Sequence, residues 1–303
     1  MLGGLRTPGQ YPVARKVMQR SLKAPVPGFT IIEVMIVLAV TGLLFVSAAA
    51  MISGKENQTA FDQSIRQIQS QIQQVVNEVS VGFYPNLGNI QCNGAGGTVA
   101  LTKAAGTAQG ANAGCVFIGK AMQFQVGNAS PEQFNVYSIA GLQKGGAGAS
   151  ESSSLSEAKP KVIAPSSAET TLPDSSTTDT LQNGLTTARM YYNNGAGDKD
   201  IGIVVFANGL AQFSATNGAL LSGAQEVSLL AIDDNNVKSK LGMDKTSGVD
   251  IINSKLSTLT PSATMGVYLC FASGGTDQSG LITIGSNGRQ LAVNLAIKSG
   301  KVC

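Results

Sequence analysis

One carboxylate, Glu33, lies inside an apolar run near the N-terminus of this 303-residue chain. The run extends from Phe29 to Ile52, and Glu33 is its only charged residue. Because a charged side chain within a membrane helix costs free energy, the carboxylate indicates a specific use. A cut after Gly28 would leave a free amine on Phe29, about one helical turn from Glu33. Amine and carboxylate could then neutralise each other in a low-dielectric setting, within one chain or between neighbours.

A basic leader precedes the apolar run. The leader contains five of the 21 basic residues of the chain and none of its 18 acidic residues. The remainder of the chain therefore carries a net charge of −2. The five are Arg6, Arg15, Lys16, Arg20 and Lys23. Basic flanks stay on the cytoplasmic side of a membrane, which predicts that everything after the run is translocated. The charge of the remainder gives no support for a nucleic-acid partner.

The apolar run is long enough to cross a membrane. As a helix, its 24 residues would extend about 36 Å, against about 30 Å for a bilayer core. An ordinary secretory signal peptide is the alternative, with Ala48, Ala49 and Ala50 as its small-residue cleavage site. Glu33 interrupts the apolar core, however, and that core exceeds the usual length of about 7–15 residues. The sequence therefore favours a retained membrane helix.

Gly28, Phe29 and Glu33, followed by the apolar run, resemble the class III signal of type IV prepilins and pseudopilins. The resemblance implies that residues 1–28 are a leader, which a prepilin peptidase removes by cutting between Gly28 and Phe29. It also implies methylation of the new Phe29 amine. Glu33, the fifth residue after the cut, would help to set the register of each subunit against its neighbour.

The same resemblance implies a structural subunit of a type IV pilus or a related filament, with roles in adhesion, twitching motility or DNA uptake. Its partners would be other pilin subunits, as a homo- or hetero-oligomer, and an inner-membrane assembly platform. The chain would first lie in the inner membrane as a single-pass precursor and then in an extracellular pilus. A secretion pseudopilin and a non-polymerising, secreted or membrane-anchored binding module remain open alternatives.

A second apolar pattern follows the membrane segment and predicts an amphipathic helix. Its members recur at steps of three and four residues, which places them in one stripe: Phe61, Ile65, Ile68, Ile72, Val75, Val76 and Val79. We expect one helix over residues 29–81, membrane-spanning at 29–52, with Gly82 and Pro85 ending it. The stripe is expected to pack on a sheet of the same chain.

Residues 82–303 are predicted to form a β-rich head, which makes the fold class α+β. The chain contains 36 glycines and no tryptophan, and only 13% of its residues are charged. Strand-like runs occupy 115–118, 122–126, 134–139, 225–232 and 265–273, whereas 249–256 fits a strand or a short helix. Two hairpins are predicted, one pairing 201–207 with 210–215 through Asn208-Gly209 and one pairing 281–284 with 290–297.

Residues 145–180 are rich in Ser, Thr, Ala, Pro and Gly and contain no aromatic residue. Such a composition buries too little surface to offset the entropy of ordering. The sequence predicts a mobile, low-complexity surface insertion, and a glycosylated segment is the sharper alternative.

Four cysteines in a translocated domain indicate disulfides. Three connectivities are possible for four cysteines. Cys92–Cys115 and Cys270–Cys303 are favoured, because each pair lies within one local segment. The second pair also resembles the C-terminal disulfide loop of many Gram-negative type IV pilins.

Catalytic motifs are absent from the sequence. Histidine does not occur, and no serine lies in a G-x-S-x-G motif. No glycine-rich phosphate loop is present either, so neither an enzyme nor a cofactor is expected.

Two further segments admit a functional and an ordinary interpretation. Residues 193–200, with Asp198 and Asp200, offer oxygen ligands for calcium but also fit an ordinary turn, which is favoured. Gly288-Arg289 resembles the start of the Gly-Arg-x-Arg signature of DNA-binding minor pilins. Leu291 replaces its second arginine, so a solvated hairpin-turn arginine is favoured.

Overall fold

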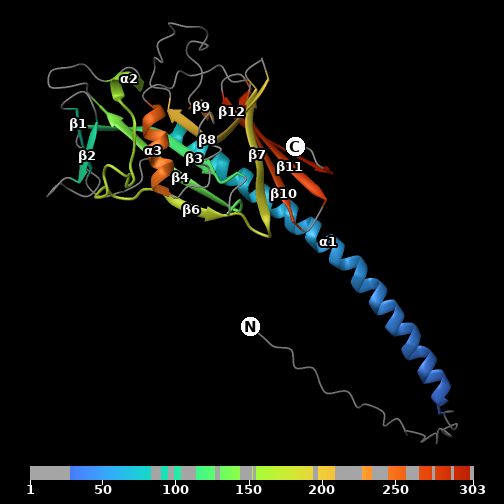
Figure 1. Ribbon diagram of the computed structural model, residues 1–303. Coiled ribbons are helices and arrows are strands. Elements are labelled where there is room, and N and C mark those ends of the chain that lie inside the picture. Colours follow the sequence, from blue (N-terminus) through green and yellow to red (C-terminus); the bar gives the residue numbers. More distant parts are fainter. Residues whose placement is uncertain are drawn as a thin grey trace, which may run out of the picture. The chain divides into compact units, whose positions relative to one another are not determined.

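A computed structural model of the chain describes residues 28–82, 90–94, 99–103, 114–126, 130–143, 152, 155–193, 197–208, 227–233, 245–256, 266–274, 277–287 and 290–300 (Figure 1). The chain divides into two compact units, residues 1–52 and 53–303. The boundary falls where the sequence places the end of the membrane segment. The second unit is called the head below.

Helix α1 (Ile31–Ser80) begins in the first unit and ends in the head. Gly82 ends it with a φ of 67°, a left-handed conformation that glycine adopts without strain. The amide of Gly82 then donates to the Val79 carbonyl at 3.1 Å. The single helix predicted for residues 29–81 is therefore present to within two residues at each end.

The head is built on a ten-stranded, antiparallel sheet with the order β12-β11-β10-β7-β8-β3-β4-β5, in which β6 also pairs with β4 and β9 with β8. A separate pair, β1 and β2, and two further helices complete the described elements. Their bounds are β1 (Ile90–Asn93), β2 (Ala100–Lys103), β3 (Cys115–Phe124), β4 (Gln133–Leu142), α2 (Leu155–Ala158), β5 (Lys161–Val162), β6 (Thr177–Thr180), β7 (Leu185–Asn193), β8 (Asp198–Asn208), β9 (Val227–Asp233), α3 (Lys245–Leu256), β10 (Val267–Ser273), β11 (Gln278–Asn287) and β12 (Gln290–Ser299). The layout agrees with an α+β fold, although this sheet is larger than the sheet of a pilin head.

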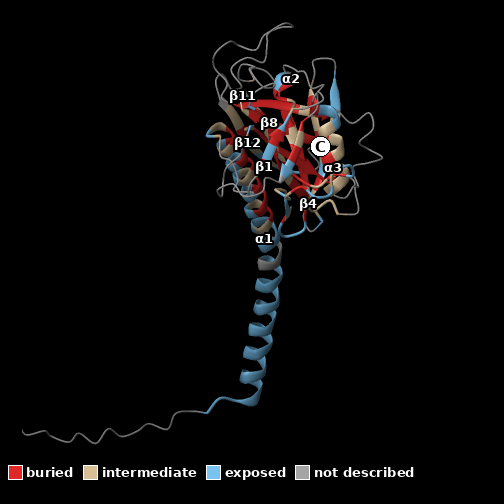
Figure 2. Cartoon of the chain, turned by 90° about the vertical axis from the view of Figure 1, so that its left-hand side faces the viewer, coloured by how far each residue is buried: buried red, intermediate tan, exposed pale blue. Residues whose placement is uncertain are grey.

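The apolar stripe of α1 packs on one face of this sheet, as the sequence predicts. Every member from Phe61 to Val79 is at most 7% exposed, and together they share a core with side chains from the sheet. Figure 2 shows this burial within the head. At Gly280 of β11, a Cβ would lie 1.7 Å from Ile65 Cδ1, so the strand and the helix approach each other closely there.

The opposite face of β3, β4, β8 and β9 is covered by α3 and α2. Along β8 the side chains alternate: Val204 and Phe206 face α1, whereas Ile203 and Val205 face α3. A strand buried on both faces is apolar at nearly every position, which explains the unbroken run in its sequence.

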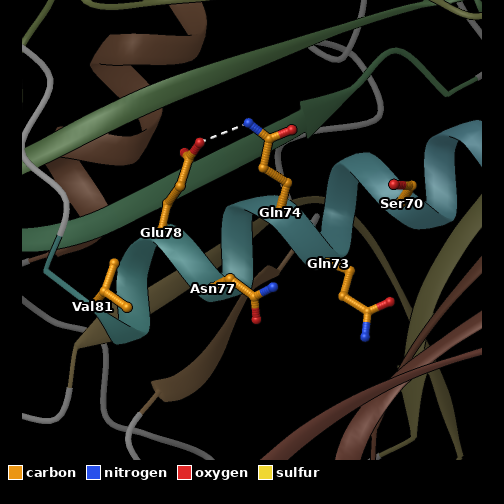
Figure 3. Close-up of a pocket in the computed structure, with 6 residues that line it drawn as sticks. All are labelled: Ser70, Gln73, Gln74, Asn77, Glu78 and Val81. Atoms are coloured by element: carbon orange, nitrogen blue, oxygen red, sulfur yellow. Dashed lines mark hydrogen bonds between the residues drawn. The ribbon is translucent and has the colours of Figure 1, made fainter. Parts of the chain in front are cut away.

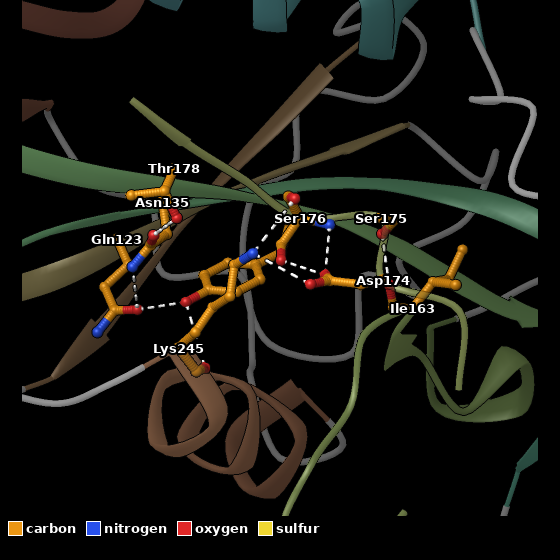
Figure 4. Close-up of polar contacts among 9 residues, drawn as sticks. Gln123, Asn135, Ile163, Asp174, Ser175, Ser176, Thr178 and Lys245 are labelled. Atoms are coloured by element: carbon orange, nitrogen blue, oxygen red, sulfur yellow. Dashed lines mark hydrogen bonds and ion pairs between the residues drawn. The ribbon is translucent and has the colours of Figure 1, made fainter. Parts of the chain in front are cut away.

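A polar network attaches α3 to the sheet (Figure 4). The buried Tyr137 hydroxyl donates to Gln123 Oε1 at 2.6 Å, and Lys245 in the first turn of α3 is 3.1 Å from Asp174. Burial by itself raises the pKa of Asp174, but hydrogen bonds from Ser176 and Lys245 hold it below its usual range. Residues 249–256, ambiguous in the sequence, are helical because Val249, Ile252 and Leu256 then share one buried face.

Two expectations about the head are wrong. The first hairpin does not form, because β3 and β9 occupy both edges of β8 from Ile203 to Ala207 and leave none for 210–215. Residues 209–226 themselves lie outside the described residues. The second hairpin is present as β11 and β12, with Asn287 opposite Gln290.

The second wrong expectation concerns the insertion at 145–180, whose described part is built into the head. It contributes α2, β5 and β6, and the last two strands pair with β4. Its leucine, valine and isoleucine side chains are buried: Leu155, Val162, Ile163 and Leu172. The average composition of the segment did not reveal these four apolar side chains. They are few, but they are spaced so that each reaches the core of the head.

The Cys92–Cys115 disulfide joins β1 to the start of β3, with Cα atoms 5.1 Å apart. It is one of the two pairings that the sequence favours. Cys270 is also disulfide-bonded, whereas its expected partner Cys303 lies outside the described residues.

Candidate assembly surface on the N-terminal helix

The apolar part of α1 is exposed on every side. Leu43, Leu44, Phe45 and Val46 are 74%, 61%, 78% and 69% exposed. Four consecutive residues point in four directions around a helix, so the described part of the chain covers no side of this segment. Among the described residues, α1 is the one helix long and apolar enough to span a membrane.

Hydroxyl groups within this segment are satisfied by the helix itself. Thr41 Oγ1 donates to the Val37 carbonyl at 2.8 Å, and Ser47 Oγ donates to the Leu44 carbonyl at 2.9 Å. A polar group without a partner would cost several kcal/mol in lipid, on the order of 4–8 on hydrocarbon scales. These internal bonds therefore suit the segment to a bilayer or to a tight bundle of helices.

The first turn of α1 contains Glu33, and Thr30 caps it. The Glu33 amide lies 3.1 Å from the Thr30 carbonyl and 3.3 Å from Thr30 Oγ1. This cap was missed in the sequence, although Thr-x-x-Glu before an apolar run is its usual signature. The negative charge of Glu33 also lies at the positive end of the helix dipole.

Gly28 and Phe29 precede the helix and are exposed. Phe29 is 81% exposed, and a Cβ placed on Gly28 would meet no atom within 4 Å. The peptide bond between them is therefore accessible from solvent. The rest of the expected leader, residues 1–27, lies outside the described residues.

Farther along α1, within the head, a groove of about 500 Å³ is lined by Ser70, Gln73, Gln74, Asn77, Glu78 and Val81 (Figure 3). Gln74 Nε2 donates to Glu78 Oε1 at 2.8 Å, and Lys120 forms an ion pair with the other carboxylate oxygen. Burial by itself raises the pKa of Glu78, but the hydrogen bonds from Lys120 and Gln74 lower it below its usual value. The one charge in the lining is thus already neutralised.

The candidate calcium ligands Asp198 and Asp200 lie beside the guanidinium group of Arg189. Asp200 accepts a hydrogen bond from Arg189 Nε at 2.7 Å, and Asp198 lies 3.7 Å from the same guanidinium. Asn193 Nδ2 donates to Asp198 Oδ1 at 3.2 Å across the paired ends of β7 and β8, and residues 194–196 between them lie outside the described residues. Within the described ranges, no three His, Cys, Asp or Glu side chains gather to hold a metal ion. Residues 288 and 289, the start of the DNA-binding signature, lie outside those ranges.

Comparison with known proteins identifies no relative: no family model, no curated protein and no solved structure matches this chain.

Proposed function

We propose that this protein is a subunit of a type IV pilus or a related filament, which acts by assembly rather than by catalysis. The observation that carries the proposal is the first turn of α1, where an exposed Gly28–Phe29 bond and Glu33 introduce a helix that is apolar on every side. In a bilayer such a helix is an anchor. Transferred into a filament, it buries the same surface against other copies.

Glu33 has a defined task in this proposal. After cleavage, the amine of Phe29 and the carboxylate of Glu33 carry opposite charges at the same end of the helix. Each would be costly if buried alone, by several kcal/mol. A neighbouring subunit that brings its amine to this carboxylate satisfies both, and in doing so it fixes the axial register of the two helices.

Replacing Glu33 by Ala tests this task. We expect Glu33→Ala to leave cleavage and membrane insertion intact and to reduce filament yield roughly tenfold or more, because the amine is left without a partner. Immunoblots of sheared filaments and of membranes measure the two pools. Glu56→Ala, an exposed carboxylate on the same helix beyond the apolar run, is the control and should assemble normally. Normal filaments from Glu33→Ala would refute the role of the carboxylate.

A membrane-anchored or secreted module that never polymerises is the second candidate. The residues of the alternative cleavage site, Ala48 to Ala50, lie within the continuous helix α1, and a protease that binds extended substrates would have to unwind it. N-terminal sequencing of surface material separates the two candidates. A start at Phe29 supports the filament subunit, and a start at Met51 supports the secreted module.

A further inference from the structure

Among the described elements, β12 is the long edge strand of the sheet; β9 lies near it but does not pair with it. Strand β12 pairs with β11 over ten consecutive residues without a register shift. It contains no proline or glycine, and Lys298 is its only charge. At the other end of the sheet, β5 has only two residues and β6 only four. Natural proteins shorten, charge or kink an exposed edge to prevent the addition of another strand, and β12 uses these devices least.

One contact shows which backbone groups of β12 face outward along the sheet. Gln69 of α1 donates to the Val293 carbonyl at 2.9 Å, so this carbonyl points away from β11. Backbone groups alternate in direction along a strand, hence those of Leu295 and Ile297 point the same way. Among the described elements, only β11 pairs with β12.

The second half of β12 is the more open half. Val293 is 7% exposed, whereas Asn294, Ala296 and Lys298 are exposed on the face away from α1. Leu295 and Ile297 face the core but are only half-buried, although both are apolar. An added strand would cover these two side chains and satisfy their backbone groups.

We propose that residues 293–299 pair antiparallel with the same residues of a second copy of this chain, about a two-fold axis at Ala296. This register places Leu295 opposite Ile297 twice, which makes two apolar cross-strand pairs on the inner face. Lys298 then lies opposite Asn294, so no like charges meet. An identical strand is therefore a complementary partner, as a closed two-fold contact requires.

This contact does not depend on the filament function. It joins heads, whether these belong to neighbouring filaments or to separate anchored molecules. Residues of the groove and of the first turn of α1 take no part in it.

Cysteine cross-linking of the full-length protein in membranes tests the register. In the proposed pair the two Ala296 Cα atoms lie about 4.5 Å apart, within the range for a disulfide. We expect Ala296→Cys to form a dimer upon mild oxidation that is lost upon reduction, with the linked peptide containing Cys at position 296 from both copies.

Asn294→Cys is the matched control, because Asn294 is exposed on the same face of the same strand. Two copies of residue 294 would be offset by four residues, about 13 Å along the strand, so the variant should give about tenfold less dimer. Combining Asn294→Cys with Lys298→Cys should restore the dimer. No dimer from Ala296→Cys, equal dimer from Asn294→Cys, or linkage to a different protein would each overturn the proposal.

The result of the cross-linking experiment can be distinguished from the result of the test of the proposed function. Filaments without the Ala296 cross-link would refute only the head contact. A cross-link in a protein that starts at Met51 and forms no filaments would refute only the filament function.

Discussion

Glu33 and Glu78 are carboxylates of the same helix in opposite settings. Glu33 is exposed in the first turn, where the described residues supply no cation for it. Glu78 lies against the sheet and pairs with Lys120. A carboxylate that has its partner within the chain stabilises the head, whereas one that lacks it is available to another molecule. Under the proposed function, Glu78 serves the stability of the head and Glu33 serves assembly.

Replacing Glu78 by Gln should make stability less dependent on pH. The pKa of Glu78 is lowered in the folded head, so its ionised form stabilises the fold above the unfolded pKa of about 4.3. This stabilisation is lost as the pH falls through the lowered pKa. We expect Glu78→Gln to melt below the unmodified protein at pH 7 and to approach it near pH 3, as thermal unfolding in detergent can measure. A constant difference across this range would contradict the ion-pair role.

At the scale of elements, β8 holds the head together because it pairs with β7, β3 and β9. Its backbone lies close to that of β3 at Gly119, beside an irregularity in the register of β3 and β4. A Cβ at Gly119 would lie 1.9 Å from the Phe206 carbonyl oxygen. Backbone atoms in the centre of a sheet cannot yield as a side chain can.

We therefore expect Gly119→Ala to destabilise the head by about 1–3 kcal/mol or more, because β3 and β8 must separate. Urea unfolding followed by circular dichroism measures the change. Gly274→Ala, where a Cβ would meet no atom within 4 Å, is the control. Equal stability of the two variants would show that the strands adjust without cost.

The Cys92–Cys115 disulfide stabilises an element that has little core of its own. Strands β1 and β2 form a two-stranded sheet over a small cluster that includes Ile90 and Leu101. With a separation of 23 residues, the bridge is worth roughly 3–4 kcal/mol in the chain-entropy model.

Replacing both cysteines by serine should therefore expose residues 90–115 to limited proteolysis before the rest of the head is cut. Mass spectrometry of the first fragments identifies the sites. Cleavage at the same sites and the same rate as in the unmodified protein would contradict this role of the bridge.

At the scale of the whole molecule, the two units bury their residues differently. The first exposes its apolar side chains from Phe29 to Met51, whereas the head contains three apolar clusters among its described residues. The head includes its own part of α1, from Ser53 to Ser80.

We expect a chain that begins at Ser53 to fold as a soluble head, because each cluster is made from residues after that point. Its thermal unfolding should be cooperative, with a midpoint close to that of the full-length protein in detergent. A chain that begins at Ile90, and so lacks the stripe of α1, should fail to fold. Cooperative unfolding of the shorter chain would show that the stripe is dispensable.

The sequence by itself determined that α1 is one helix with a membrane-spanning part and an amphipathic part, because both parts follow from the spacing of residues close together in the chain. A charge-free run after Glu33 predicts a membrane helix, and steps of three and four from Phe61 to Val79 predict a buried stripe. The hairpin of β11 and β12 was equally local. Only the tertiary structure decided that β9 pairs with β8, that residues 155–180 join the head, and that β12 is an edge. The reason is physical: strand neighbours distant in sequence are selected by which apolar faces can be buried together, and no short window of sequence contains both partners.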